Sequence, residues 1–212
     1  MQNKARLHIV FSGYWSCSTG RGHGASLDSI VARDHIGLPI VPGRTIKGIL
    51  RDAYERVFGF EMADILFGSS GFTLENDEPR AIEDTFAGAL TFSNGTINPE
   101  VRNWISSANN GTSEEQAKAQ KLTETLFVNL SRTAINDQGA AKNKSLRVIE
   151  AVVPLHITAT ISLLNATSET SQDETALGDW IANLNDACAT IDGVGSNRSR
   201  GLGRCHVSLE EA

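Results

Sequence analysis

The feature that most constrains the fold is a repeated change in the spacing of apolar residues along the chain. Apolar side chains occupy every second position in residues 6–12, 155–163 and 204–209, which is the pattern of a half-buried strand. In residues 45–58 and 177–191 they instead recur at the i, i+3, i+4, i+7 spacing of an amphipathic helix. Each predicted helix lies between predicted strands, so the chain must combine both kinds of element in one core.

A further strand predicted over residues 86–92 gives the order strand, helix, two or more strands, helix, strand. This order is the split βαβ pattern, so we predict an α+β protein with a ferredoxin-like (RRM-like) βαββαβ core. The open sheet face and the loops of such a core are a common platform for single-stranded RNA.

We expect residues 1–212 to form a single domain with large insertions at about 13–42 and 94–150. Segments of this length outside the core are typical of functional insertions rather than of ordinary turns. Within the second insertion, the polar residues 106–116 predict a loop and residues 118–130 predict a short helix.

The composition is that of a folded protein, since 40% of the 212 residues are hydrophobic. Acidic residues outnumber basic ones by 25 to 19, and the net charge of -6 argues against binding nucleic acid through bulk positive charge alone. No stretch approaches the roughly 20 apolar residues that span a bilayer, and no export signal is evident. We therefore expect a cytoplasmic protein with no membrane partner. The spacing of Cys17, Cys188 and Cys205 suggests neither a disulfide framework nor a zinc site.

The basic residues are concentrated in three segments, residues 33–51, 131–147 and 192–204. Each segment contains three or four lysines and arginines and one aspartate, whereas the rest of the chain is acidic. Phosphate binding needs several cations on one surface, and acidic surface elsewhere limits indiscriminate binding. The alternative is that each segment is ordinary solvated surface.

The most specific feature of the sequence is residues 38–51, which read LPIVPGRTIKGILR. Pro42 and Gly43 are typical of a turn into a helix N-terminus, where free backbone amides and the helix dipole favour a phosphate. Lys47 and Arg51 are four residues apart, so they share one face of the predicted helix.

A glycine-rich segment, GVGSNRSRGLGR over residues 193–204, precedes the last predicted strand. Glycines have no Cβ atom, so their backbone amides can approach a phosphate, and Arg198 and Arg200 supply charge beside them. The alternative interpretation is a flexible turn without a ligand. Such a loop is weak evidence by itself and becomes strong in combination with the first motif.

These two segments resemble the "LPYIPGSSLKGxLR" and "GxxRSRGxGR" signatures of the RAMP superfamily of CRISPR effector proteins. Residues 66–69 (LFGS) and 88–92 (GALTF) are similar to two further elements of that family, so the resemblance spans residues 5–209. Residues 132–150 resemble the "RxxIDRxxGxAxxxxLRxxE" hairpin of the repeating backbone subunits in type III complexes. The resemblance thus points to a backbone subunit.

Such a resemblance implies that the chain polymerises along a guide RNA, with residues 131–150 inserted as a thumb that displaces a nucleotide at regular intervals. It implies as partners guide RNA, complementary target RNA and other CRISPR effector subunits, including copies or paralogues of this chain. On this basis, Leu130, Ile135 and Leu146 are expected to contact bases while basic residues hold phosphate. The expected RNA-binding residues are Arg44, Lys47, Arg51, Arg132, Arg147, Arg198 and Arg200.

The resemblance also identifies Asp28 as the counterpart of the aspartate that supports metal-dependent cleavage of target RNA in catalytic members of the family. A carboxylate at that place suits Mg²⁺ or another divalent metal, or a water molecule, near the scissile phosphate, helping the ribose 2′-hydroxyl to attack. Asp34 is the rival carboxylate, but its neighbours favour a structural Asx turn. His8 and His156 lie within strands and have no evident nucleophile or metal partner.

Two alternatives stay open at this stage. The chain is a non-catalytic structural RNA-binding subunit if Asp28 is inert, or a metal-independent guide-processing endoribonuclease if His23 or His35 acts as general acid or base. The chain also departs from the family, because residues 15–20 (WSCSTG) replace its His-x-Gly element. A nucleotide-binding enzyme is disfavoured, because the glycines of residues 20–24 lack the GKS/T ending of a phosphate loop.

Overall fold

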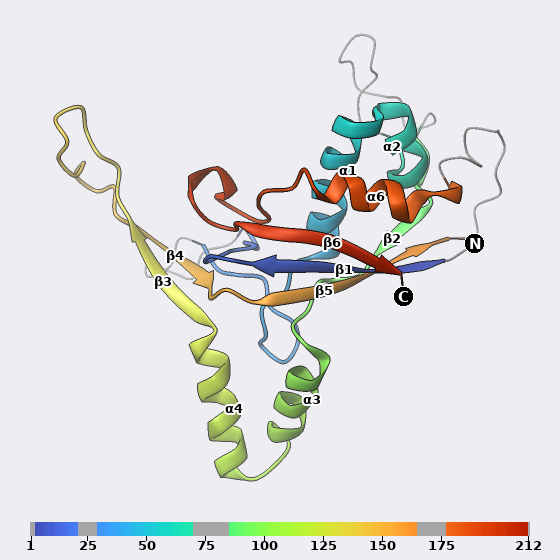
Figure 1. The fold of residues 1–212 in the computed structure, drawn as a ribbon. Helices are drawn as coiled ribbons and strands as arrows, with labels where there is room; N and C mark the ends of the chain where they lie inside the picture. Colours follow the sequence, from blue (N-terminus) through green and yellow to red (C-terminus); the bar gives the residue numbers. More distant parts are fainter. Residues whose placement is uncertain (1–2, 21–28, 70–84, 165–176, 212) are drawn as a thin grey trace.

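The computed structural model describes residues 3–20, 29–69, 85–164 and 177–211. Its principal elements in chain order are β1 (Lys4–Phe11), α1 (Gly43–Phe58), α2 (Phe60–Phe67), β2 (Leu90–Phe92), α3 (Pro99–Ala108), α4 (Ser113–Thr125), β3 (Phe127–Arg132), β4 (Arg147–Val152), β5 (His156–Leu163), α6 (Trp180–Cys188), the 3-10 turn η2 (Arg198–Arg200) and β6 (Cys205–Glu211). Figure 1 shows a central sheet with helices on one side, together with a helix pair and a long hairpin that project from it.

The central sheet has four antiparallel strands in the order β2-β5-β1-β6. Helix α1 connects β1 toward β2, α6 connects β5 toward β6, and both helices lie on the same face of the sheet (Figure 1). This is the predicted α+β, ferredoxin-like βαββαβ arrangement. Both projecting parts, α3 with α4 and β3 with β4, belong to the segment between β2 and β5.

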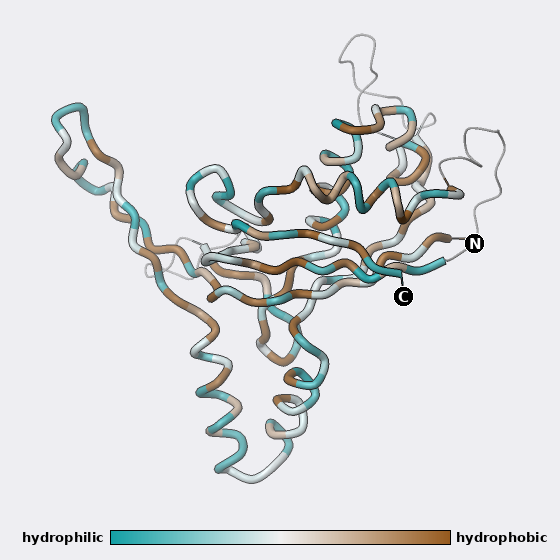
Figure 2. Tube along the Cα trace, in the orientation of Figure 1, coloured by the Kyte–Doolittle hydropathy of each residue, from teal (hydrophilic) through white to brown (hydrophobic). Residues whose placement is uncertain are grey.

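The core forms where the sheet meets α1 and α6, as the spacing of apolar residues predicts. The strand positions with alternating apolar side chains are buried, and so is one stripe of each helix. Figure 2 shows hydrophobic and hydrophilic positions following one another along these elements. These buried residues include Leu7, Ile9, Phe11, Ile157, Ile161 and Val207 from the strands and Ile46, Leu50, Tyr54, Trp180 and Leu184 from the helices. Fully burying one such side chain stabilises the fold by about 1.5–3 kcal/mol.

The prediction of a loop over residues 106–116 is wrong at both ends, because α3 extends to Ala108 and α4 begins at Ser113. Local caps explain how polar sequence forms these helices: the Asn98 side chain accepts from the Glu100 amide, and Thr112 and Glu115 form a capping box. Helix α2 was not predicted either. Among the described residues, no helix is both long and apolar enough to cross a membrane.

The hairpin of β3 and β4 forms a separate two-stranded sheet that extends away from the core (Figure 1). The prediction of a helix over residues 118–130 therefore fails after Thr125, because the chain becomes extended at Phe127. The register pairs Arg132 with Arg147 across the two strands. Like charges directly opposite each other destabilise a hairpin, so this pair costs stability in the free protein.

Candidate nucleic-acid interface

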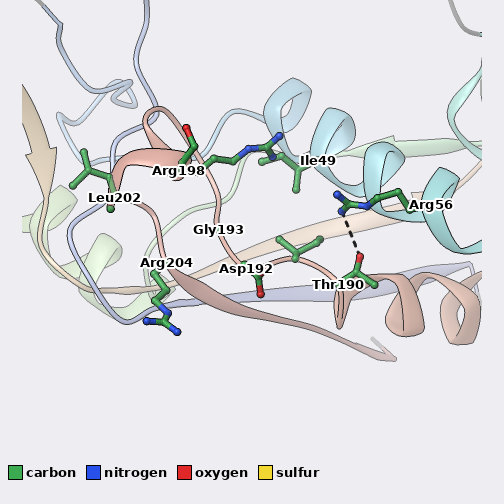
Figure 3. A pocket seen from close by; sticks show the side chains of 11 residues that line it. Ile49, Arg56, Thr190, Asp192, Gly193, Arg198, Leu202 and Arg204 are labelled. Carbon is green, nitrogen blue, oxygen red and sulfur yellow. Dashed lines mark hydrogen bonds between the residues drawn. The ribbon is translucent and has the colours of Figure 1, made fainter.

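Two adjoining pockets form one groove between α1 and the loop of residues 190–204, which we call the α1–loop groove. The larger pocket has a volume of about 680 Å³ and the smaller one about 430 Å³, and both are lined by Ile49 and Arg198. The side chain of Arg198 extends from the loop toward Ile49 on α1 (Figure 3). The other charged lining residues are Arg56, Asp192 and Arg204 in the larger pocket and Asp52 in the smaller.

The arginines of the α1–loop groove are held only weakly by the protein. Arg198 Nη2 lies 3.9 Å from Asp52 Oδ2, and Arg56 Nη1 lies 3.6 Å from the same oxygen. All three side chains are about half exposed, and ion pairs of this kind contribute roughly 0–1 kcal/mol. Asp52 therefore does not hold either guanidinium strongly.

The glycines of the loop are required by close packing of the chain against itself. A Cβ atom at Gly195 would collide with the carbonyl oxygen of Ser16, and one at Gly203 would collide with that of Val194. Both glycines also have positive φ, which other residues adopt only with strain. The packing at these two glycines holds η2, and with it Arg198 and Arg200, at the surface. That the glycine amides of the loop approach a phosphate stays a prediction.

At the start of α1, the backbone amides are less open to a phosphate than the sequence predicts. The Gly43 amide donates to Asn94 Oδ1 at 2.9 Å, and the Thr45 and Ile46 amides donate to the Pro42 carbonyl oxygen. A Cβ atom at Gly43 would lie 2.6 Å from the Phe92 carbonyl oxygen, so this glycine lets α1 pack closely against β2. The Ile46 bond is the first of the helix itself, so two of the first-turn amides that a phosphate would use, those of Gly43 and Thr45, already have partners.

The seven residues expected to bind RNA fall into different environments. The guanidinium of Arg51 already has its partners inside the protein, because it donates to Glu55, to the Gly68 carbonyl oxygen and to Asp64. Arg51 therefore joins α1 to α2 and does not belong to the candidate interface. Arg44 is exposed and Lys47 half-buried on the first turns of α1, outside the lining of the α1–loop groove.

The tip of the hairpin exposes apolar side chains to solvent. Ile135 is 69% exposed and Leu146 is 68% exposed, the two largest exposed fractions among the large apolar residues described. The tip is ordered by Asn136, whose Oδ1 accepts from the Gln138 and Ala140 amides at 3.1 and 2.9 Å. Apolar residues held outward on a structured hairpin favour contact with another molecule.

The base of the hairpin is joined to the segment of residues 29–33 by buried Glu150. Its carboxylate accepts from the Val31 amide at 3.0 Å and from Arg33 Nη2 at 2.5 Å, and its own amide donates to the Ser29 carbonyl oxygen. The Arg33 Cζ atom also lies 3.6 Å from the centre of the Phe127 ring. Sequence reasoning missed this contact, because it joins residues more than a hundred positions apart.

The candidate catalytic and metal-binding residue Asp28 lies outside the described residues, as does His23. Asp34 forms the predicted Asx turn, because its Oδ1 accepts from the Ile36 and Leu38 amides, and its other oxygen pairs with Arg102. Within the described residues, no group of three or more His, Cys, Asp or Glu side chains is placed to hold a metal ion. The described residues thus offer no donor set that fits Mg²⁺, and we derive no step through the ion.

The three cysteines are expected to be unreactive in the native protein. Burial raises the pKa of Cys17 and of Cys188 to about 12 and that of Cys205 to about 11. Since the thiolate is the nucleophile, alkylation by iodoacetamide at pH 8 should be about 100-fold slower in native protein than in urea-unfolded protein. Mass spectrometry of timed samples measures this rate. Rapid modification of Cys17 without unfolding would contradict its burial, because Cys17 is only 3% exposed.

The sequence of the chain, compared with family models, matches the RAMP superfamily over residues 19–206. The chain belongs to the RAMP superfamily. This confirms the resemblance that the two glycine-containing motifs indicated. No curated protein matches the sequence of this RAMP protein at a significant level.

Solved structures similar to this RAMP protein include two chains from cryo-EM studies of type III-B Cmr-beta. The chain in the apo state is 11% identical with a TM-score of 0.60, and the alignment covers 99% of this chain and 97% of that one. The chain in the state bound to cognate target RNA is 9% identical with a TM-score of 0.63, covering 99% and 98%. At such low identity, the likeness establishes a shared fold over nearly the whole of each chain.

Proposed function

We propose that this RAMP protein is a guide-RNA-binding backbone subunit of a type III CRISPR effector complex. The observation that carries the proposal is the combination, on one chain, of an arginine-lined groove beside a glycine-rich loop and a projecting hairpin with exposed apolar residues. Family membership and the fold shared with type III-B Cmr-beta chains support it. Its partners are guide RNA, complementary target RNA and neighbouring subunits.

The guide backbone is assigned to the α1–loop groove, with Arg198 at its centre and Arg200 beside it on η2. Phosphate contacts of this kind position RNA without reading its sequence, as a subunit that accepts any guide requires. The hairpin would place Ile135 and Leu146 against bases, while Arg132 and Arg147 face a phosphate together. An anion between these two arginines would remove their mutual repulsion.

Cleavage of target RNA is the further part of the proposal and is assigned to Asp28. Its support is the resemblance at that position, and its neighbour in the chain, Ser29, is paired with the base of the hairpin through Glu150. Mg²⁺ stays a prediction of the resemblance. The second candidate is a structural RNA-binding subunit in which Asp28 does not cleave RNA.

The test of the groove is charge reversal of Arg198 and Arg200 together in the full chain. We expect weaker binding of guide RNA, with the slope of log affinity against log salt shallower by about two, since each lost phosphate contact removes about one. Fluorescence anisotropy over a range of salt concentrations measures both quantities. The matched control is Lys121→Glu, an exposed charge on α4. If the variant with Arg198 and Arg200 reversed binds guide RNA with the same slope of log affinity against log salt as the wild type and the control, the guide does not lie in this groove.

A further inference from the structure

The face of the central sheet opposite α1 and α6 is polar. Strand residues alternate between faces, so the burial of Leu7 and Ile9 under the helices directs Arg6 and His8 to the opposite side. The residues on this open face are Lys4, Arg6, His8, Val10, His156, Thr158, Thr160, Ser162, His206, Ser208 and Glu210. Protein–protein interfaces need an apolar or aromatic centre, and Val10 is the one large apolar side chain in this set. The face therefore suits a polar ligand better than another protein.

A row of polar side chains in close contact crosses the three strands at the centre of this face. His8 Nδ1 lies 2.9 Å from His156 Nε2, and His8 Nε2 lies 3.0 Å from Glu210 Oε1. The hydrogen bond from His8 lowers the pKa of the Glu210 carboxyl, so this group is ionised at neutral pH. The two imidazole rings have centroids 5.1 Å apart and planes inclined by 31°. Together they offer adjacent flat surfaces of the kind on which nucleobases stack.

A pocket of about 410 Å³ adjoins this row, within the range of about 300–1,000 Å³ typical of sites for small organic ligands. Arg6 and His8 line it together with side chains that form hydrogen bonds: Ser93, Asn94, Thr96, Thr158 and Thr160. Hydroxyl and amide groups are suited to a ribose 2′-hydroxyl or a base edge. The pocket thus combines a cation, one imidazole ring and neutral polar groups, which suit the phosphate, the base and the sugar of a nucleotide.

Arg6, the cation of the pocket, can exchange its present carboxylate partner for an incoming phosphate. Arg6 Nη1 lies 3.3 Å from Glu210 Oε1, and both side chains are more than half exposed. A pair of this kind contributes about 0–1 kcal/mol, so a phosphate can take the place of Glu210 beside Arg6. His8 would then lie between the phosphate and the ring of His156.

We propose that the open face is a second RNA-binding surface, which seats one nucleotide of a single strand with its phosphate at Arg6 and its base near His8 and His156. It lies on the other side of the sheet from α1, so it is separate from the α1–loop groove (Figure 1). A free nucleoside monophosphate has the same chemistry. The experiment must therefore distinguish a strand from a free nucleotide.

The first arm measures RNA affinity with the groove disabled. In a full-length Arg198→Glu/Arg200→Glu background, anisotropy of a fluorescent ten-nucleotide oligouridylate is compared with and without Arg6→Ala or His8→Gln. Each added change should weaken residual binding about tenfold, the equivalent of one lost stacking or phosphate contact. Lys121→Ala is the control for loss of charge, and circular dichroism confirms folding. Unchanged affinity, or an equal loss in Lys121→Ala, overturns the proposal while leaving the groove assignment intact.

The second arm identifies the residues that meet the ligand. NMR of histidine-labelled protein, assigned with His→Gln variants, follows the ring signals of His8 and His156 during titration with the oligouridylate and, separately, with uridine monophosphate. Saturable shifts at these two rings with the oligonucleotide, and not at exposed His35, support the proposal. Shifts with the mononucleotide alone reject the RNA strand and identify a free nucleotide as the ligand. No shift at either ring with either ligand refutes the site.

Discussion

Replacing Asp28 with alanine is expected to reduce cleavage of complementary RNA by the assembled complex by about a hundredfold or more, while complex assembly and target binding persist. The reason is chemical: a carboxylate at that position would arrange a water molecule or the ribose 2′-hydroxyl at the scissile phosphate, and alanine cannot. Circular dichroism and urea unfolding of the variant check that it folds with wild-type stability. Lost activity would thus report on the reaction.

The measurement uses labelled target RNA with the complex in Mg²⁺ or in EDTA, comparing wild type, Asp28→Ala and Asp34→Ala. Asp34 is a demanding comparison, because its carboxylate supports the turn before α1 through two amides and Arg102. Asp34→Ala should lower the free energy of unfolding. The fraction of this variant that remains folded should still cleave target RNA. Full cleavage by Asp28→Ala would show that Asp28 is not the catalytic residue, and the function of this chain would then be that of a structural RNA-binding subunit. Cleavage that persists in EDTA would reject the metal requirement.

The core of the fold could be predicted because its signals are regular and local. Alternation in β1 and β5 and the stripe on α1 follow directly from which side chains must be buried. Helix α3 was not predicted and α4 was predicted only over its second half, since their sequences are polar and their starts depend on single caps at Asn98 and Thr112. Periodicity detects a buried face, so it fails for helices that project from the molecule.

The site was harder to predict, because its geometry depends on contacts between distant segments. Arg51 has the spacing of a surface cation, yet its partner Asp64 lies on α2, an element that the sequence did not indicate. His8 and His156 meet only because β1 and β5 pair in one register. A shift of one residue would send the two rings to opposite faces of the sheet. The types of these residues suggest that they can bind a ligand, but the pairing of the strands decides which of them lie together.

Replacing Glu150 with alanine should destabilise the protein more than any surface substitution considered above. Glu150 is buried, and its carboxylate is the acceptor for both the Val31 amide and Arg33. Removing one partner of a buried ion pair costs about 3–5 kcal/mol, and because Arg33 is 38% exposed we expect about 2–4 kcal/mol here. Urea unfolding followed by circular dichroism measures the change, with Glu124→Ala on α4 as the control for loss of an exposed carboxylate.

Two further variants separate the charge of Glu150 from its hydrogen bonds. Glu150→Gln retains an oxygen that can accept from the Val31 amide, so it should cost about 1–2 kcal/mol, less than alanine. Arg33→Met removes the cation and its stacking on Phe127, and combining it with Glu150→Gln should cost less than the sum of the two, because neither charge is then left unpaired. Additive costs would mean that the pair is not coupled. A Glu150→Ala variant as stable as Glu124→Ala would show that the base of the hairpin is held by its backbone pairing, with Ser29 and with Trp15, and not by the Glu150 carboxylate.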